Sequence, residues 1–180
     1  MGADVPIFLI GPRGSGKSTV GRLLAGRLNL PFEDTDDCLQ KEAGGTVSQI
    51  VERNGWEYFR QREGAVLRAA TARIGVGVIA TGGGMVLDPA NRTFMRATGC
   101  VFYLRAPARE LAVRLSEDPR ETLRPCLTGL PLAAEVAKVA AERDPLYRET
   151  AHHVFDATLP PGEVCEKIVE ILPDGLRRRK

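Results

Sequence analysis

The sequence lacks the features that mark membrane, secreted and nucleic-acid-binding proteins. No apolar run approaches the roughly 18 residues that a membrane-spanning helix needs. Its four cysteines form no Cys-x-x-Cys pair and have no histidine at zinc-ligand spacing, which argues against a metal site or a redox motif. The net charge of +2 is too small to indicate a nucleic-acid partner. The stretch "MGADVPIFLI" has no basic region typical of a signal peptide. We therefore expect a cytoplasmic protein with reduced thiols and no membrane partner.

The 180 residues, 43% of them hydrophobic, are enough for one globular domain. Short apolar runs predict strands at 5–10, 31–35, 76–81, 100–106 and 153–157. Helical patterns lie at 17–29, 56–72, 107–117 and 132–149, and Thr46 with Gln49 resembles a capping box before a helix stop at Gly55. This alternation predicts a three-layer α/β/α fold with a five-stranded parallel sheet, whose ligands bind beyond the carboxyl ends of the strands.

The stretch "GPRGSGKSTVGR" begins at residue 11, directly after the first predicted strand. Gly11, Gly16, Lys17 and Ser18 match the G-x-x-x-x-G-K-[ST] pattern of a loop that binds phosphates with its backbone N–H groups. In this pattern Lys17 lies against the β- and γ-phosphates and Ser18 ligates Mg²⁺. The alternative is a glycine-rich helix entry that holds no ligand. The guanine-selecting Asn-Lys-x-Asp pattern is absent, which disfavours a GTPase.

Two further motifs follow predicted strands. In "FEDTDD", Asp34 and Asp36 are two residues apart, so in an extended segment both carboxylates face the same side. One carboxylate could then lie near Mg²⁺ and the other near an acceptor hydroxyl, although such a run is also typical of a polar turn or a helix cap. In "TGGGMV", the glycines at 82–84 let the backbone approach a ligand closely, or form a flexible turn.

Together the motifs resemble those of the shikimate kinase family. "GPRGSGKSTVGRLLA", "FEDTDD", "EYFRQRE", "ATGGGMV", "RPCL" and "ERDPLY" occur in that family's order over about residues 5–172. The resemblance implies a phosphate-loop fold of the nucleoside-monophosphate-kinase type, with a mobile lid at about 116–131 and a basic tail at 173–180. It implies transfer of the γ-phosphoryl of ATP, with one Mg²⁺, to the 3-hydroxyl of shikimate in aromatic amino-acid (chorismate) biosynthesis. We expect a cytoplasmic monomer.

The resemblance also assigns roles to single residues. The residues expected to bind ATP are Gly14, Ser15, Gly16, Lys17, Ser18, Thr19 and the lid residue Arg124. Those expected to bind shikimate are Asp36, Gly82, Gly83, Gly84 and two arginines, Arg60 and Arg143, that clamp its carboxylate. Ser18 and Asp34 are the expected metal residues. Lys17, Asp36 and Arg124 are the expected catalytic residues.

Three features depart from the family pattern. Cys126 stands where the family commonly has an aliphatic residue, and the approach to the lid is slightly longer. The stretch "DATLPPGE" lacks an arginine that the family often has at the adenine, so adenine contacts are expected only from the backbone at about Thr158 to Pro160. Two other functions remain possible on the motifs, namely a kinase for another polyol acid such as gluconate and a ligand-sensing regulator.

Overall fold

Five parallel strands form the centre of the protein in the computed structural model, which describes residues 5–118, 126–173 and 176. The strands are β1 (Ile7–Ile10), β2 (Phe32–Asp34), β3 (Val78–Ala80), β4 (Cys100–Arg105) and β5 (His153–Asp156). Their order in the sheet is β2-β3-β1-β4-β5, and all four pairings are parallel. The five predicted strands and the α/β fold class are confirmed.

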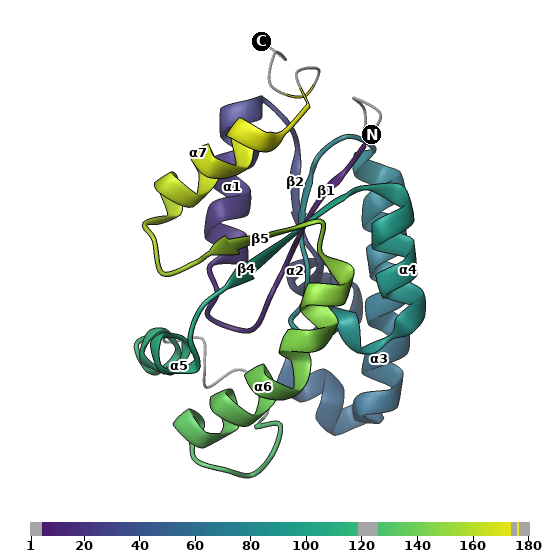
Figure 1. Cartoon of the computed structure of the whole chain (residues 1–180). Coiled ribbons are helices and arrows are strands. Elements are labelled where there is room, and N and C mark those ends of the chain that lie inside the picture. Colours follow the sequence, from purple (N-terminus) through teal and green to yellow (C-terminus); the bar gives the residue numbers. More distant parts are fainter. Residues whose placement is uncertain (1–4, 119–125, 174–175, 177–180) are drawn as a thin grey trace.

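Helices cover both faces of this sheet. They are α1 (Lys17–Leu28), α2 (Thr35–Ala43), α3 (Val47–Ile74), α4 (Pro89–Thr98), α5 (Ala108–Ser116), α6 (Leu132–Thr150) and α7 (Pro161–Ile171), with a short 3₁₀ helix η1 (Met85–Leu87). Figure 1 shows α1 and α7 together on one side of the strands and α3 and α4 on the other. The helices α2, α4 and α7 were not predicted from the sequence. Within the described ranges, no helix is long and apolar enough to cross a membrane.

Alternate residues of each strand point to opposite faces of the sheet, and apolar residues occupy both sets of positions in β1. Ile7 and Leu9 belong to a core formed with α1 and α7, whereas Phe8 and Ile10 belong to a core formed with α3, α4 and α6. All four side chains are fully buried. Burial on both faces is what a parallel sheet between two helical layers requires.

The long helix α3 contains a break that the sequence predicted. Thr46 and Gln49 form the expected capping box at its start. Gly55 has φ 82° and ψ 167°, which is not helical, and a second helical segment continues from Trp56. A third apolar cluster of Leu39, Ile50, Phe59 and Val66 packs α2 against both parts of α3. The break therefore lets α3 fold over α2 beside the carboxyl ends of the strands.

The register of the sheet aligns the three motif-bearing strands. Leu9 of β1 pairs with Ala80 of β3, and Ala80 pairs in turn with Asp34 of β2. The chain leaves these strands at Gly11, Thr35 and Thr81, all at the same edge of the sheet. The carboxyl ends of parallel strands thus bring together three motifs that are far apart in the sequence.

Helix α1 approaches β2 closely, and glycine makes this approach possible. A Cβ atom added to Gly21 would lie 2.5 Å from Cε2 of Phe32, whereas one added to Gly26, in the same helix, would meet nothing within 4 Å. Gly21 thus lets α1 and its first residues come near the end of β2.

We expect Gly21→Ala to lower the free energy of unfolding by about 1–3 kcal/mol, because the added methyl group overpacks the contact with Phe32. The matched change Gly26→Ala should raise it by about 0.5–1 kcal/mol, because alanine favours a helix and no atom opposes it. Urea denaturation of both variants measures the difference. Equal stability of the two variants would contradict the packing described for Gly21.

Candidate active site

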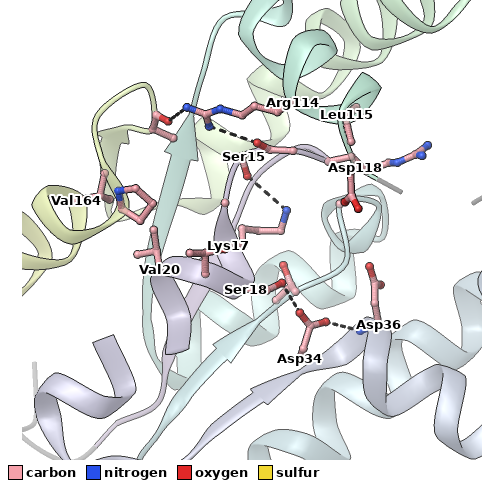
Figure 2. Close-up of a pocket in the computed structure, with 18 of the residues that line it drawn as sticks. Ser15, Lys17, Ser18, Val20, Asp34, Asp36, Arg114, Leu115, Asp118 and Val164 are labelled. Carbon is pink, nitrogen blue, oxygen red and sulfur yellow. Dashed lines mark hydrogen bonds between the residues drawn. The ribbon is translucent and has the colours of Figure 1, made fainter. Parts of the chain in front are cut away.

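The phosphate-loop motif forms a turn between β1 and α1. Gly14 and Gly16 have φ angles of 76° and 87°, which favour glycine. Lys17 Nζ donates hydrogen bonds to the carbonyl oxygens of Gly11 (2.9 Å) and Pro12 (2.8 Å). The loop borders a cleft of about 360 Å³, which is lined by the six loop residues that were predicted to bind ATP, namely Gly14, Ser15, Gly16, Lys17, Ser18 and Thr19. Figure 2 shows Lys17 inside the curve of the loop, beside Ser15.

The two predicted metal residues contact each other at the start of α1. Ser18 Oγ donates a hydrogen bond of 2.5 Å to Asp34 Oδ2 (Figure 2). No group of three or more His, Cys, Asp or Glu residues suited to a metal exists among the residues the structure describes. Mg²⁺ is often held by only one or two protein ligands together with substrate phosphates. The hydroxyl and carboxylate oxygens at the mouth of the phosphate loop therefore fit Mg²⁺ bound with a nucleotide.

The geometry of Asp34 and Asp36 corrects one step of the sequence prediction. The segment is not extended through both residues, because α2 begins at Thr35 and Asp36 lies in its first turn. Asp34 is the N-cap of α2 and accepts a hydrogen bond from the Asp36 N–H (3.0 Å). Both side chains nevertheless line the cleft. Helical geometry, rather than alternation along a strand, brings them there.

A second, smaller cavity adjoins the cleft and contains most of the residues predicted to bind shikimate. It is lined by Arg13, Asp36, Val47, Trp56, Phe59, Arg60, Glu63, Gly83, Gly84, Leu127 and Arg143. Arg60 comes from α3 and its guanidinium lies 5.0 Å from the ring centre of Trp56. Arg143 comes from α6 and donates to the Gly83 carbonyl oxygen (3.1 Å). The two predicted clamp arginines, 83 residues apart in sequence, thus line one cavity.

None of the three glycines has a positive φ, and two of them, Gly82 and Gly84, are required for space, whereas a Cβ on Gly83 would lie no nearer than 3.5 Å to any atom. A Cβ on Gly82 would lie 2.5 Å from Asp36 Oδ1, and one on Gly84 would overlap the guanidinium of Arg60. Gly82 N–H donates to Thr35 Oγ1 (2.9 Å). Tyr147, a buried residue that the sequence analysis missed, donates through its hydroxyl to the Gly83 carbonyl oxygen (2.6 Å). The segment therefore packs closely against the acidic and basic residues of the site.

Glu63 is a second residue that the sequence analysis missed. It lies on α3, is buried, and forms an ion pair with Arg60. Burial raises its pKa to about 7, the nearby charge of Asp36 acts in the same direction, and Arg60 and Arg143 oppose the shift. Its spacing of three residues from Arg60 on a helix was the available sequence signal. A carboxyl group thus faces the same cavity as the two arginines.

The other end of the cleft lies beside the segment after β5. Arg114 of α5, also missed from the sequence, donates to the carbonyl oxygens of Ala157 (2.8 Å) and Gly14 (3.4 Å). It connects the phosphate loop to this segment, as Figure 2 shows. Of the predicted stretch Thr158 to Pro160, Leu159 lines the cleft, while Thr158 hydrogen-bonds to Asp156.

The predicted lid is described only at its two ends. Arg124 lies outside the described residues, as do all of 119–125. Before this gap Asp118 lines the cleft, and after it Leu127 lines the second cavity. Cys126, which departs from the family pattern, donates through its thiol to Glu135 Oε2 (2.8 Å).

Comparisons with known proteins agree with this geometry. The family model described as shikimate kinase matches residues 13–173. "Shikimate kinase 2" of Yersinia enterocolitica is 52% identical over 168 residues, which cover 93% of this chain and 95% of that protein. The solved shikimate kinase of Acinetobacter baumannii in complex with shikimate has a TM-score of 0.86 and 36% identity, over 93% of this chain and 92% of that one. A gluconokinase of Sinorhizobium meliloti, with a TM-score of 0.54 and 18% identity, covers 99% of this chain and 94% of that one and shares the fold.

The raised pKa of Glu63 predicts a pH dependence of stability. The folded protein retains this proton up to about pH 7, whereas the unfolded chain releases it near pH 4.5. The unfolded state therefore binds fewer protons in this interval, and stability falls as pH rises through it. As the pH rises through this interval, the free energy of unfolding of the unmodified protein should fall by up to about 3 kcal/mol relative to that of Glu63→Gln. Urea denaturation of both proteins at pH 5 and pH 8 tests this, and a constant difference would contradict it.

Proposed function

Because the chain belongs to the shikimate kinase family, it is a phosphotransferase with an alcohol acceptor, and we propose that it transfers the γ-phosphoryl of ATP to the 3-hydroxyl of shikimate. The products are shikimate 3-phosphate and ADP, and the reaction belongs to aromatic amino-acid (chorismate) biosynthesis. In this proposal the cleft is the ATP site and the second cavity is the shikimate site.

One observation carries the proposal: the cleft and the second cavity share a wall. Arg13, Asp36 and Gly83 line both. Phosphoryl transfer requires the acceptor oxygen and the leaving oxygen to lie roughly in line across the transferred group. Two adjoining cavities with a common carboxylate satisfy this requirement, because a hydroxyl in one cavity can face the terminal phosphate in the other.

Asp36 at the shared wall and the residues of the cleft have different roles in the transfer. The acceptor oxygen forms a bond to the γ-phosphorus while the bond from that phosphorus to the β–γ bridging oxygen breaks, leaving ADP. Asp36 orients the acceptor hydroxyl and accepts its proton. Lys17 leaves its loop carbonyl partners to stabilise the phosphate charge. Ser18 and Asp34, which contact each other at the mouth of the loop, would hold Mg²⁺, and the ion would supply neutralisation of the phosphate charge.

Two of the three arginines that line the second cavity account for the choice of an acid as the substrate. A guanidinium presents paired donors to a carboxylate, and Arg60 and Arg143 approach the cavity from different helices. Two such groups orient a small acid as well as bind it. Glu63 partly neutralises Arg60, but the arginines that line the cavity outnumber the carboxyl groups, which leaves positive charge for an acid. Gly83 and Gly84 line this cavity, and we propose that the ring of the substrate lies against them, with Gly82 behind them packed against Asp36.

Three further parts of the proposal extend beyond the described contacts. We propose that residues at about 116–131 act as a lid and that Arg124 within it reaches ATP, which would exclude water from the transferred group. We propose a cytoplasmic location, in keeping with four free cysteines. We also propose that the enzyme acts as a monomer.

ADP release measured across shikimate, quinate and gluconate tests the proposed acceptor. We expect shikimate to be phosphorylated with a kcat/KM at least one hundredfold above that for gluconate. Mass spectrometry of the product identifies the hydroxyl that is modified. Comparable rates with gluconate would favour a kinase for another polyol acid. No ADP release with any acceptor would favour a ligand-sensing regulator.

Lys17→Ala should lower kcat by about 10²–10³-fold, because it removes a charge that stabilises the transferred group. Lys17 is half-buried at the loop and contributes little to the apolar core, so the variant should fold. The exposed residue Lys138 offers a control, and Lys138→Ala should retain normal turnover. Turnover within threefold of normal in Lys17→Ala would exclude the proposed role.

Arg143→Ala should weaken shikimate binding far more than ATP binding, because its proposed partner is the carboxylate of shikimate. Truncation of one partner of a desolvated charge pair costs roughly 2–5 kcal/mol, which corresponds to a loss of affinity of at least about thirtyfold. Arg60→Ala should behave alike. Titration calorimetry with each substrate measures the two affinities, and Arg109→Ala on the exposed side of α5 is the matched control. An equal loss for both substrates would show that the clamp is wrongly assigned.

A further inference from the structure

A buried carboxylate on α6 lies outside the set of residues used so far. The side chain of Glu135 is 5% exposed, although it belongs to the first turns of a helix whose outer face is solvated. One of its oxygens, Oε2, accepts four hydrogen bonds from three consecutive residues of the segment before α6. The donors are the Cys126 thiol (2.8 Å), Leu127 N–H (2.7 Å), Thr128 N–H (2.9 Å) and the Thr128 hydroxyl (3.1 Å).

The other oxygen of Glu135 faces the phosphate loop. Oε1 lies 3.8 Å from Nη1 of Arg13, whose side chain is 17% exposed. Arg13 lines both the ATP cleft and the shikimate cavity. Glu135 therefore connects the start of α6 and the nearby segment Cys126 to Thr128 with the phosphate loop, which is more than 100 residues away in sequence.

The same contacts reach the wall of the shikimate cavity. Leu127, whose N–H is held by Glu135, lines that cavity together with Arg13. A displacement of Glu135 would thus move one apolar and one charged part of the wall at once. No contact between Glu135 and either cavity is needed for this effect, because the carboxylate acts through the backbone of Leu127 and the guanidinium of Arg13.

The charge state of Glu135 suits this arrangement. Burial opposes ionisation, but the hydrogen bonds from Cys126, Thr128 and Leu127 outweigh it and hold the pKa of the carboxyl below its usual value. The group is therefore ionised at neutral pH. A buried carboxylate has a large desolvation penalty and is weak evidence for added stability, whereas a fully hydrogen-bonded one specifies a single arrangement of its partners.

We propose that Glu135 is a positioning residue of the phosphoryl-transfer site: it fixes Leu127 in the wall of the shikimate cavity and Arg13 at the junction of the two cavities. This inference rests on the proposed assignment of the second cavity to shikimate. It concerns how the acceptor site is assembled, and it gives Cys126 a structural role as one of the four donors that hold the carboxylate.

Steady-state kinetics of Glu135→Gln, Glu135→Asp and the control Glu142→Gln tests the proposal, with both substrates varied in turn. Glu142 is an exposed glutamate of the same helix. Glu135→Gln should raise the KM for shikimate at least tenfold and change the KM for ATP less than threefold. Glu135→Asp, which keeps the charge on a shorter side chain, should lie between Glu135→Gln and the unmodified protein, and Glu142→Gln should be normal.

A double-variant cycle with Arg13 separates positioning from a general loss of stability. If Glu135 acts partly through Arg13, the double variant should lose less kcat/KM for shikimate than the product of the fold losses caused by Glu135→Gln and by Arg13→Ala alone. Multiplicative effects, an equal rise of both KM values, or normal kinetics in Glu135→Gln would overturn the proposal. Failure of the unmodified protein to phosphorylate shikimate would instead overturn the proposed function.

Two variants at Cys126 keep the proposal testable if Glu135→Gln does not fold, because Cys126 is exposed and its replacement leaves the carboxylate in place. Cys126→Ala removes one donor to Glu135 and should raise the KM for shikimate about two- to threefold, whereas Cys126→Ser retains a donor and should be normal. Identical kinetics of the two variants would then overturn the proposal.

Discussion

The parallel alignment of β2, β3 and β1 places three chain segments at one edge of the sheet, and the contacts of the site depend on it. Asp34, Ala80 and Leu9 occupy one row of the sheet. One or two residues further on, the chain enters α2, the triple-glycine segment and the phosphate loop. The hydrogen bond from Ser18 to Asp34 and that from Gly82 to Thr35 both cross between these segments. A shift of register in any one strand would separate them.

Small residues allow the helices to reach this edge. Gly21 lets α1 pack against Phe32, which brings the first turn of α1 to the end of β2. Gly82 and Gly84 leave space for Asp36 and for the guanidinium of Arg60. In each case the structure needs the absence of a side chain. Close packing of the apolar cores behind them then makes the positions of the polar groups well defined.

Two buried glutamates organise the charges of the site in different ways. Glu63 contacts Arg60 inside the cavity and has a raised pKa, whereas the hydrogen bonds around Glu135 lower its pKa. The difference follows from their surroundings: burial is the main cause of the raised pKa of Glu63, with the charge of Asp36 acting in the same direction, whereas at Glu135 the hydrogen bonds from Cys126, Thr128 and Leu127 outweigh burial. Glu63 thus lines the second cavity itself, whereas Glu135 is connected to its wall only through Arg13 and Leu127.

The sequence by itself determined the five strands, the phosphate loop, the capping box with the break at Gly55, and the family, because each depends on residues that are neighbours in the chain or on their order. It also selected Arg60 and Arg143, through the resemblance. Only the tertiary structure decided that Asp36 is helical, that Glu63, Tyr147, Arg114 and Glu135 belong to the site, and that Cys126 contacts a carboxylate. The contacts of Tyr147 with Gly83, of Arg114 with Ala157 and of Glu135 with Arg13 join segments that are tens of residues apart, and no local pattern in a sequence records how such segments meet when the sheet assembles.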